Sequence, residues 1–134
     1  MDSDLSVEFC RFIDTSSRYI RATVSEAVKD LGFRYYHVPF LVSIGGCPGI
    51  SQKGLCRRIP LDKSRVSIVV RELIDQGLAV NDSAGKVWSL RLTSKGREAQ
   101  DRAMGIVYSM NEELFESVSD EDKDAFLRVI RTVI

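Results

Sequence analysis

The chain has 134 residues, of which 44% are hydrophobic, 28% charged and 8% aromatic. This size and balance are ordinary for one globular domain and argue against a disordered tail or a fibrous protein. Basic and acidic residues number nineteen each, so no overall charge points to nucleic acid, a membrane or an acidic substrate. The charges are unevenly distributed, however. Residues 51–97 hold ten basic and four acidic residues, a local charge of +6, and the remainder carries −6.

The sequence offers several clues to the compartment and to bound groups. It opens with an acidic segment instead of the basic one that precedes the apolar run of a secretory signal. The longest uncharged run, residues 35–52, contains two prolines and three glycines, so we expect no membrane span. Cys10, Cys47 and Cys56 form no C-x-x-C pair, and His37 is the only histidine. We therefore expect a cytoplasmic protein without disulfides, metal or cofactor.

The N-terminal third is predicted to be helical. Apolar residues recur at helical spacing from residue 5 to residue 31, and Gly32 follows as a stop signal. A second apolar segment, residues 36–44, predicts another helix. The Gly-Gly-Cys-Pro-Gly cluster at residues 45–49 then predicts a turn.

The central segment shows two helices with clear caps. Ser51 is the predicted N-cap of a short helix that Pro60 terminates. Asp62 is placed to cap the next helix, and Gly77 to end it. Its apolar residues follow i, i+3, i+4, i+7, i+8 without a miss: Val66, Val69, Val70, Leu73 and Ile74.

The period of the apolar pattern then changes. Residues 78–80 and 87–92 read as two strands that flank a polar loop, residues 81–86, and predict a β-hairpin. Thr93 is the predicted cap of a further long helix, and Ser119 of a last one. We expect that last helix to bury Phe126, Val129, Ile130 and Val133.

The order of these elements predicts the fold. A short helix, a turn and a second helix followed by a two-stranded hairpin is the winged helix-turn-helix arrangement. The fold class is therefore mainly α with a small β-hairpin (α+β). Within a single domain, residues 35–97 form the winged helix-turn-helix, and residues 1–34 and 98–134 are flanking helices. Their apolar stripes have little core to cover in one chain, which favours a helical dimer interface.

Four segments, in order, resemble the MarR family of bacterial transcription regulators. They are Pro48–Leu55 (PGISQKGL), Leu61–Ser67 (LDKSRVS), Arg71–Leu78 (RELIDQGL) and Leu92–Gly96 (LTSKG). The resemblance implies a homodimeric transcription regulator, acting as a repressor, that binds a near-palindromic operator in double-stranded DNA and responds to a small ligand or an oxidant. Two positions depart from the family pattern. Ile68 stands where Arg or Lys is common, and Ala84-Gly85-Lys86 replaces the Asp-x-Arg of a longer wing.

Candidate DNA contacts follow from helical geometry and from the resemblance. Ile68 lies opposite the buried face and could contact a thymine methyl group, or be a simple exposed apolar residue. Arg65 and Arg71 could donate to guanine or to phosphate, and the lysines could neutralise phosphate or be only a solvated face. Backbone N–H groups at Ser51 could bind phosphate, although capping alone also explains this serine. The candidate DNA-binding residues are Ser51, Gln52, Lys53, Lys63, Ser64, Arg65, Ser67, Ile68, Arg71 and Lys86.

An aromatic cluster follows the first helix. In the MarR family a ligand cleft lies between the dimer helices and the DNA-binding part, so the resemblance implies contact with a small aromatic effector here. The candidates are Tyr35, Tyr36, His37 and Phe40, and core packing is the alternative for each.

Cys10 is a candidate redox residue. Its spacing to Arg18 resembles the hydroperoxide-sensing branch of the family, and a nearby cation favours a reactive thiolate. Asp14 stands where that branch has a tyrosine, and a buried structural cysteine is the alternative.

Two other classes of function are alternatives to a DNA-binding regulator. A winged-helix dimer that has lost DNA binding and binds proteins is favoured by Ile68 and the short wing. An enzyme is disfavoured because no nucleophile, metal-ligand or paired-carboxylate pattern stands out.

Overall fold

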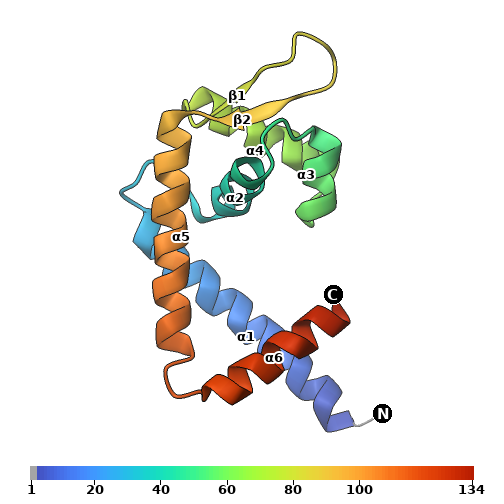
Figure 1. Cartoon of the computed structure of the whole chain (residues 1–134), viewed down its shortest axis with the longest axis vertical. Helices are drawn as coiled ribbons and strands as arrows, with labels where there is room; N and C mark the ends of the chain where they lie inside the picture. Colours follow the sequence, from blue (N-terminus) through green and yellow to red (C-terminus); the bar gives the residue numbers. More distant parts are fainter. Residues whose placement is uncertain (1–2) are drawn as a thin grey trace.

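The computed structural model describes residues 3–134, which form helices and one antiparallel hairpin in the predicted order (Figure 1). The elements are α1 (Ser3–Val28), η1 (Tyr35–His37), α2 (Val38–Gly46), α3 (Gln52–Arg58), α4 (Lys63–Asp75), β1 (Ala79–Asn81), β2 (Leu90–Leu92), α5 (Ser94–Leu114) and α6 (Asp120–Val133). The winged helix-turn-helix and the α+β class are therefore confirmed. We call residues 35–97 the winged-helix lobe, and residues 3–20 together with 108–134 the helical lobe.

Helix boundaries follow the predicted capping residues. The side-chain oxygens of Ser51, Asp62, Thr93 and Ser119 each accept the N–H three residues ahead, at 2.8–3.1 Å. These bonds satisfy amides that have no partner inside the helix. Gly77 follows α4 with φ +74°, a conformation that strongly favours glycine.

The core lies in the winged-helix lobe. Helix α2 contacts α5, β2 and α3, and α4 contacts α3 and β1. The fully buried apolar side chains come from α1, α2, α3, α4 and β2: Val28, Phe40, Leu41, Ile44, Leu55, Val66, Val69, Val70, Leu73 and Leu90. Ile74, at the edge of the α4 stripe, is half-buried. This core fixes the orientation of α4 relative to α3 and the hairpin.

The turn predicted at residues 45–49 is shorter than expected. Gly45 and Gly46 belong to α2, and Cys47 is its C-cap. Three residues after this C-cap, Ile50 forms an antiparallel backbone bridge with Leu90 of β2. A one-residue bridge leaves no period-two pattern, which is why the sequence did not reveal it.

The strands also differ from the prediction. Pairing runs from Ala79–Leu92 to Asn81–Leu90, so Val87, Trp88 and Ser89 lie in the loop instead of β2. The Asn81 side-chain oxygen accepts the Ser89 N–H at 3.0 Å and ends the regular ladder there. The wing therefore consists of β1, β2 and the loop of residues 82–89.

The helical lobe has almost no core of its own. α6 crosses α1 in the lower part of Figure 1, where the rings of Phe12 and Phe126 meet edge to face with centroids 6.0 Å apart. The expectation that α6 buries Phe126, Val129, Ile130 and Val133 is wrong for the single chain, in which α6 buries no residue. Only one face of α6 meets another element. Among the helices of residues 3–134, none is both long and apolar enough to cross a membrane.

Candidate nucleic-acid interface

A groove separates α3 and the start of α4 from the wing. Its volume is about 580 Å³, and three lysines reach it from three elements: Lys53 from α3, Lys63 from α4 and Lys86 from the wing loop. Ser51, Gln52, Cys56, Leu61, Val87 and Trp88 complete the lining. In the part of the chain that the structure describes, these lysines make no ion pair, so their charges are available to an anion.

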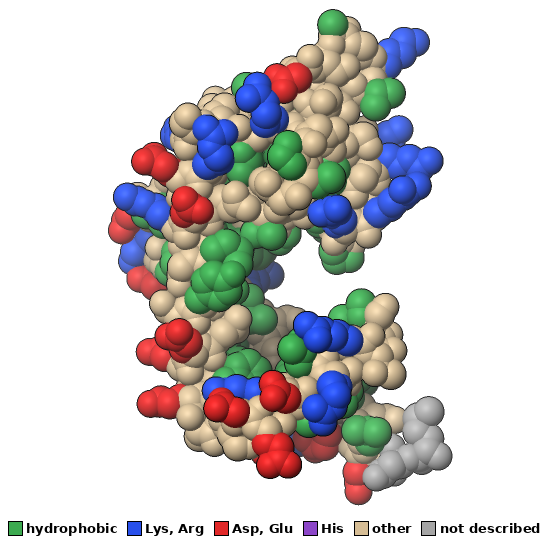
Figure 2. Space-filling model, viewed as in Figure 1, with side chains coloured by type: hydrophobic (Ala, Val, Ile, Leu, Met, Phe, Trp, Pro, Cys, Tyr) green, Lys and Arg blue, Asp and Glu red, His purple; other side chains and the backbone are tan. Residues whose placement is uncertain are grey.

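Basic side chains project from the same part of the surface. Figure 2 shows several Lys and Arg side chains along the right-hand edge of the upper lobe. Most of the Asp and Glu side chains in this view lie along the left edge and on the lower lobe. The upper lobe contains residues 51–97, the segment with ten basic and four acidic residues. The charge asymmetry of the sequence is therefore an asymmetry between the two lobes.

Gln52 and Ser67 hold the two helices of the helix-turn-helix together. The Gln52 side-chain amide donates to the Ser67 hydroxyl, and to the backbone oxygen of Lys63 at 3.2 Å. Ser51 Oγ accepts the Gly54 N–H at 3.1 Å, which confirms its capping role. Gln52 and Ser67 thus set the angle between α3 and α4, a positional role that the sequence did not suggest.

The outward face of α4 is exposed as helical geometry predicts. Ser64, Arg65, Ile68 and Arg71 are exposed, and Ser67 is half-buried by its bond to Gln52. The Ile68 side chain is 46% exposed. Donors and one apolar group therefore project side by side, the combination that base edges in a DNA major groove can contact.

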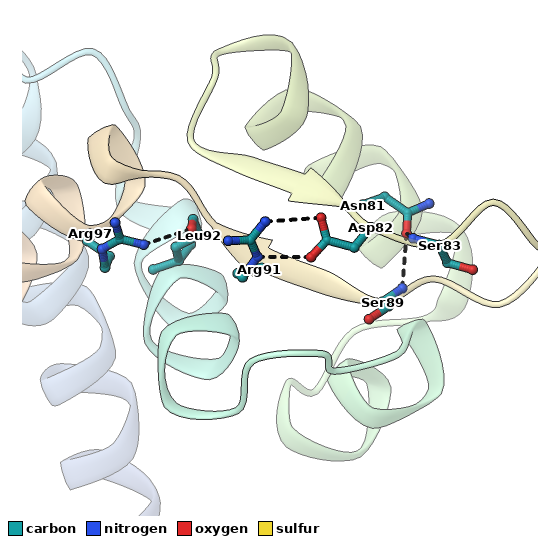
Figure 3. A network of polar contacts seen from close by, with 7 residues as sticks. All are labelled: Asn81, Asp82, Ser83, Ser89, Arg91, Leu92 and Arg97. Carbon is teal, nitrogen blue, oxygen red and sulfur yellow. Dashed lines mark hydrogen bonds and ion pairs between the residues drawn. The ribbon is translucent and has the colours of Figure 1, made fainter.

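The base of the wing is held by polar side chains (Figure 3). Arg91 on β2 lies beside Asp82 at the start of the loop, with Nε–Oδ2 2.9 Å and Nη2–Oδ1 3.1 Å. This two-pronged bond lowers the pKa of Asp82 and raises that of Arg91. Asn81 Oδ1 also accepts the N–H groups of Ser83 and Ser89. The short wing thus contains an ion pair that the sequence analysis did not predict, because nine residues separate the partners.

A partly buried polar cluster lies beside α4. The Tyr36 hydroxyl and His37 Nε2 both donate to Glu72 Oε2, each at 2.8 Å, and His37 Nδ1 accepts the Arg34 N–H at 2.9 Å. Because Nδ1 is an acceptor, the imidazole is neutral and its contact with Glu72 is a hydrogen bond, not an ion pair. Complete burial of His37 lowers its pKa further than the neighbouring carboxylate raises it.

The same bonds affect the other two groups. Partial burial raises the pKa of Glu72, but the hydrogen bonds from His37 and Tyr36 outweigh it and the net shift is downward. Partial burial and the bond to Glu72 raise the pKa of Tyr36. Sequence reasoning missed Glu72. Its only signal was an acidic residue next to the buried stripe of α4.

A cavity of about 500 Å³ lies between α1, η1 and the end of α4. We call it the η1 cavity, and only some of the predicted aromatic residues line it. Tyr35 and Tyr36 line it, whereas His37 and Phe40 are fully buried and do not. The remaining lining residues are Ser25, Val28, Lys29, Gly32, Phe33, Arg34 and Gln76. The Gln76 side-chain oxygen is buried and has no hydrogen-bond partner among residues 3–134.

Cys10 is exposed on α1, so the interpretation as a buried cysteine is wrong for the single chain. The neighbouring cations have other partners. Arg11 pairs with Glu8 at 3.2 Å, and Arg18 Nε donates to the Asp14 backbone oxygen at 3.5 Å. Within residues 3–134, no three His, Cys, Asp or Glu side chains are grouped to hold a metal ion.

No protein-family model and no curated protein sequence matches the chain. Solved structures do match its fold. A MarR transcriptional regulator from Methanosarcina mazei Go1 superposes with a TM-score of 0.88 at 20% identity, covering 96% of this chain and 93% of that one. A putative MarR family transcriptional regulator from Listeria monocytogenes, complexed with 26mer DNA, gives 0.86 at 19% identity, covering 92% and 85%.

A third match is a MarR family protein of Mycobacterium tuberculosis in complex with p-aminosalicylic acid. Its TM-score is 0.73 at 22% identity, with 92% of this chain and 95% of that chain covered. These likenesses extend over nearly the whole chain, flanking helices included, and they agree with the four segments noted in the sequence. The chain therefore has the winged-helix fold of MarR family transcriptional regulators.

Proposed function

We propose that the protein is a sequence-specific regulator of transcription that binds double-stranded DNA as a homodimer and acts as a repressor. The observation that carries this proposal is the convergence of Lys53, Lys63 and Lys86 on one groove, beside the exposed outer face of α4. A similar fold that has been crystallised with 26mer DNA supports it.

The geometry suggests how the lobe docks. α4 enters the major groove with Arg65, Ile68 and Arg71 toward the base edges, and the wing loop approaches the adjacent minor groove. The three lysines neutralise phosphates and release counterions, which supplies affinity without sequence preference. Specificity then depends on the outer face of α4.

The dimer is inferred from the helical lobe. Many of its apolar side chains are only partly covered in one chain: Leu5, Phe9, Phe12, Ile13, Phe126, Val129 and Val133 are all more than a third exposed. A surface of this kind is rare on a monomer, and a second copy of α1 and α6 covers it symmetrically. Two-fold symmetry then places two α4 helices one DNA turn apart and predicts a near-palindromic operator.

The effector is inferred from the η1 cavity. Tyr35 and Phe33 offer aromatic contact, Lys29 and Arg34 offer positive charge, and the unpartnered Gln76 oxygen offers an acceptor. These groups fit a small aromatic acid that carries a hydroxyl or amino donor. The similar fold determined with p-aminosalicylic acid is consistent with this class of ligand. A response to oxidant depends on Cys10, whose exposure permits it.

The test is binding of the purified chain to the DNA upstream of its own gene, against a scrambled duplex of equal composition, at several salt concentrations. We expect selective binding whose log affinity falls linearly with log salt. Combining Lys53→Gln, Lys63→Gln and Lys86→Gln should reduce that slope by about 2 to 3, since each phosphate contact contributes about 0.9. Lys123→Gln, in the helical lobe, is the control and should leave the slope unchanged.

The alternative, a winged-helix dimer that binds proteins, predicts a different result. A confirmed dimer that shows no selective DNA binding at low salt would contradict the regulator and favour this alternative, for which Ile68 on the outer face is the supporting observation.

A further inference from the structure

Tyr36 lies where three parts of the molecule meet. One side of the residue lines the η1 cavity, and its hydroxyl donates to Glu72 on α4. The guanidinium of Arg65, near the start of α4, lies 5.7 Å from the centre of its ring. Arg65 and Glu72 are seven residues apart, almost two full helical turns, and so lie on the same side of α4. Tyr36 therefore contacts α4 at both ends of one face.

We propose that Tyr36 is a positioning residue for DNA recognition: its ring holds the Arg65 guanidinium in the place from which it contacts the operator. The inference rests on the proposed function. Arg65 is exposed and reaches no carboxylate within ion-pair distance among residues 3–134, so without the ring its long side chain samples many rotamers. A cation over an aromatic face is attracted by the ring quadrupole, and the planar guanidinium suits this arrangement.

The position of the ring is itself fixed. The Tyr36 hydroxyl shares Glu72 Oε2 with the fully buried His37, whose other nitrogen is bonded to the Arg34 backbone. The Tyr35 ring packs edge to face against Tyr36 with centroids 5.7 Å apart. The order placed on Arg65 thus comes from the cluster of Tyr36, His37 and Glu72 and from the contact with Tyr35, and Tyr36 also lines the η1 cavity.

The test is a double-mutant cycle on operator affinity in the full-length protein. Arg65→Ala should weaken binding about tenfold, and Tyr36→Leu about threefold. If Tyr36 acts through Arg65, Tyr36→Leu should cost nothing further in the Arg65→Ala background. Arg71→Ala is the matched control, because Arg71 is on the same helix without a contact to Tyr36, so the Tyr36→Leu loss should persist in that background.

Rescue separates positioning from folding. Tyr36→Phe keeps the ring and its edge-to-face contact with Tyr35 but loses the bond to Glu72, so it should recover part of the affinity that Tyr36→Leu loses. A threefold loss that persists in the Arg65→Ala background would overturn the inference while leaving the regulator intact. Absence of operator binding by the wild type would overturn both.

A second measurement applies if Tyr36→Leu does not fold. In the NMR spectrum of the wild type, the Arg65 Nε–H proton should resonate upfield of its random-coil position because the guanidinium lies over the Tyr36 ring. An unshifted proton would contradict the inference.

Discussion

The two lobes use apolar residues in opposite ways. In the winged-helix lobe the side chains of Phe40, Leu41 and Leu73 are fully buried, and the surface is basic. In the helical lobe Phe9, Phe126 and Val129 are 54%, 38% and 58% exposed, and the residues outside 51–97 carry a net charge of −6. One lobe completes its core within the chain. The other leaves many of its apolar side chains partly exposed, and this is the surface that we propose a second copy covers.

This difference shows why one stretch of sequence can be interpreted alone and another cannot. In α4 the apolar stripe of the sequence is the face that the structure buries, so the remaining residues of the helix can be assigned to the exposed face from the sequence alone. In α6 the stripe is equally regular, but α6 buries no residue, and the ring of Phe126 contacts those of Phe12 and Phe115. What covers the rest of that stripe in the proposed dimer cannot be found within one chain.

The difference between buried and exposed apolar residues is tested most directly by truncating a side chain of the core. Leu73→Ala should lower the free energy of unfolding by about 3 kcal/mol, because it removes a fully buried side chain and leaves a cavity. Val87→Ala, at a position 69% exposed in the wing, should change it by less than about 0.5 kcal/mol. Urea unfolding measures both. Equal costs would show that the wing packs more tightly than its exposure indicates.

The helical lobe should respond through association instead. Val129→Asp places an unpaired charge on its apolar surface and should raise the Kd of the dimer at least about a hundredfold. Val87→Asp is the matched control, an exposed valine in the other lobe, and should not affect dimerisation. Sedimentation velocity over a concentration series measures the Kd. An unchanged Kd for Val129→Asp would exclude this surface as the dimer interface.

Two glycines of α5 differ in how closely other atoms pack against them. At Gly96, beside the hairpin, an added Cβ would lie 1.9 Å from the Leu78 backbone oxygen, so Gly96→Ala should destabilise by about 2 kcal/mol. At Gly105 nothing lies within 4 Å, and Gly105→Ala should stabilise by about 0.5 to 1 kcal/mol through helix propensity. Thermal unfolding compares them. Destabilisation by Gly105→Ala would indicate close packing there in the dimer.

The smallest expected effect is a pH dependence of stability from His37. Burial lowers its pKa below 6.5, so the unfolded chain binds more protons than the folded one when the pH falls below this value. Stability should be fully present above pH 6.5 and decline as the pH falls toward the folded pKa. His37→Gln can accept the Arg34 N–H and donate to Glu72 without titrating, and should lack this decline.

The pH windows separate the two groups of the cluster. The pKa of Glu72 is lowered from 4.5, so its contribution is lost only below that pH. Between pH 5 and pH 7, therefore, a change in the free energy of unfolding with pH reports the titration of His37 and not that of Glu72. A decline of the same size in His37→Gln would assign the effect to another group.

The local signals of the sequence proved reliable. Ser51, Asp62, Thr93 and Ser119 cap helices as predicted, and Gly77 ends α4. The reason is that capping and helix termination depend on residues within one turn of each other. The assignment of DNA contacts to the outer face of α4 and to the three lysines remains a prediction, to which the structure adds their common location.

Contacts between distant residues were not foreseen. The bond of Asp82 to Arg91 spans nine residues, and the bond of Tyr36 to Glu72 spans thirty-six. The end of β2 was also misplaced, because the Asn81 side chain replaces a backbone partner for Ser89. Such pairings depend on how whole elements approach each other, which a local pattern does not encode.

The sequence by itself determined the order of the elements, the buried face of α4 and the charge asymmetry, because helical periodicity, caps and composition are local properties. Only the tertiary structure decided which polar groups meet: the lysines around the groove, the cluster of Tyr36, His37 and Glu72, and the division of the aromatic residues between the η1 cavity and the core. Packing of the winged-helix core brings these groups together, since it fixes α4 against η1, α3 and the wing.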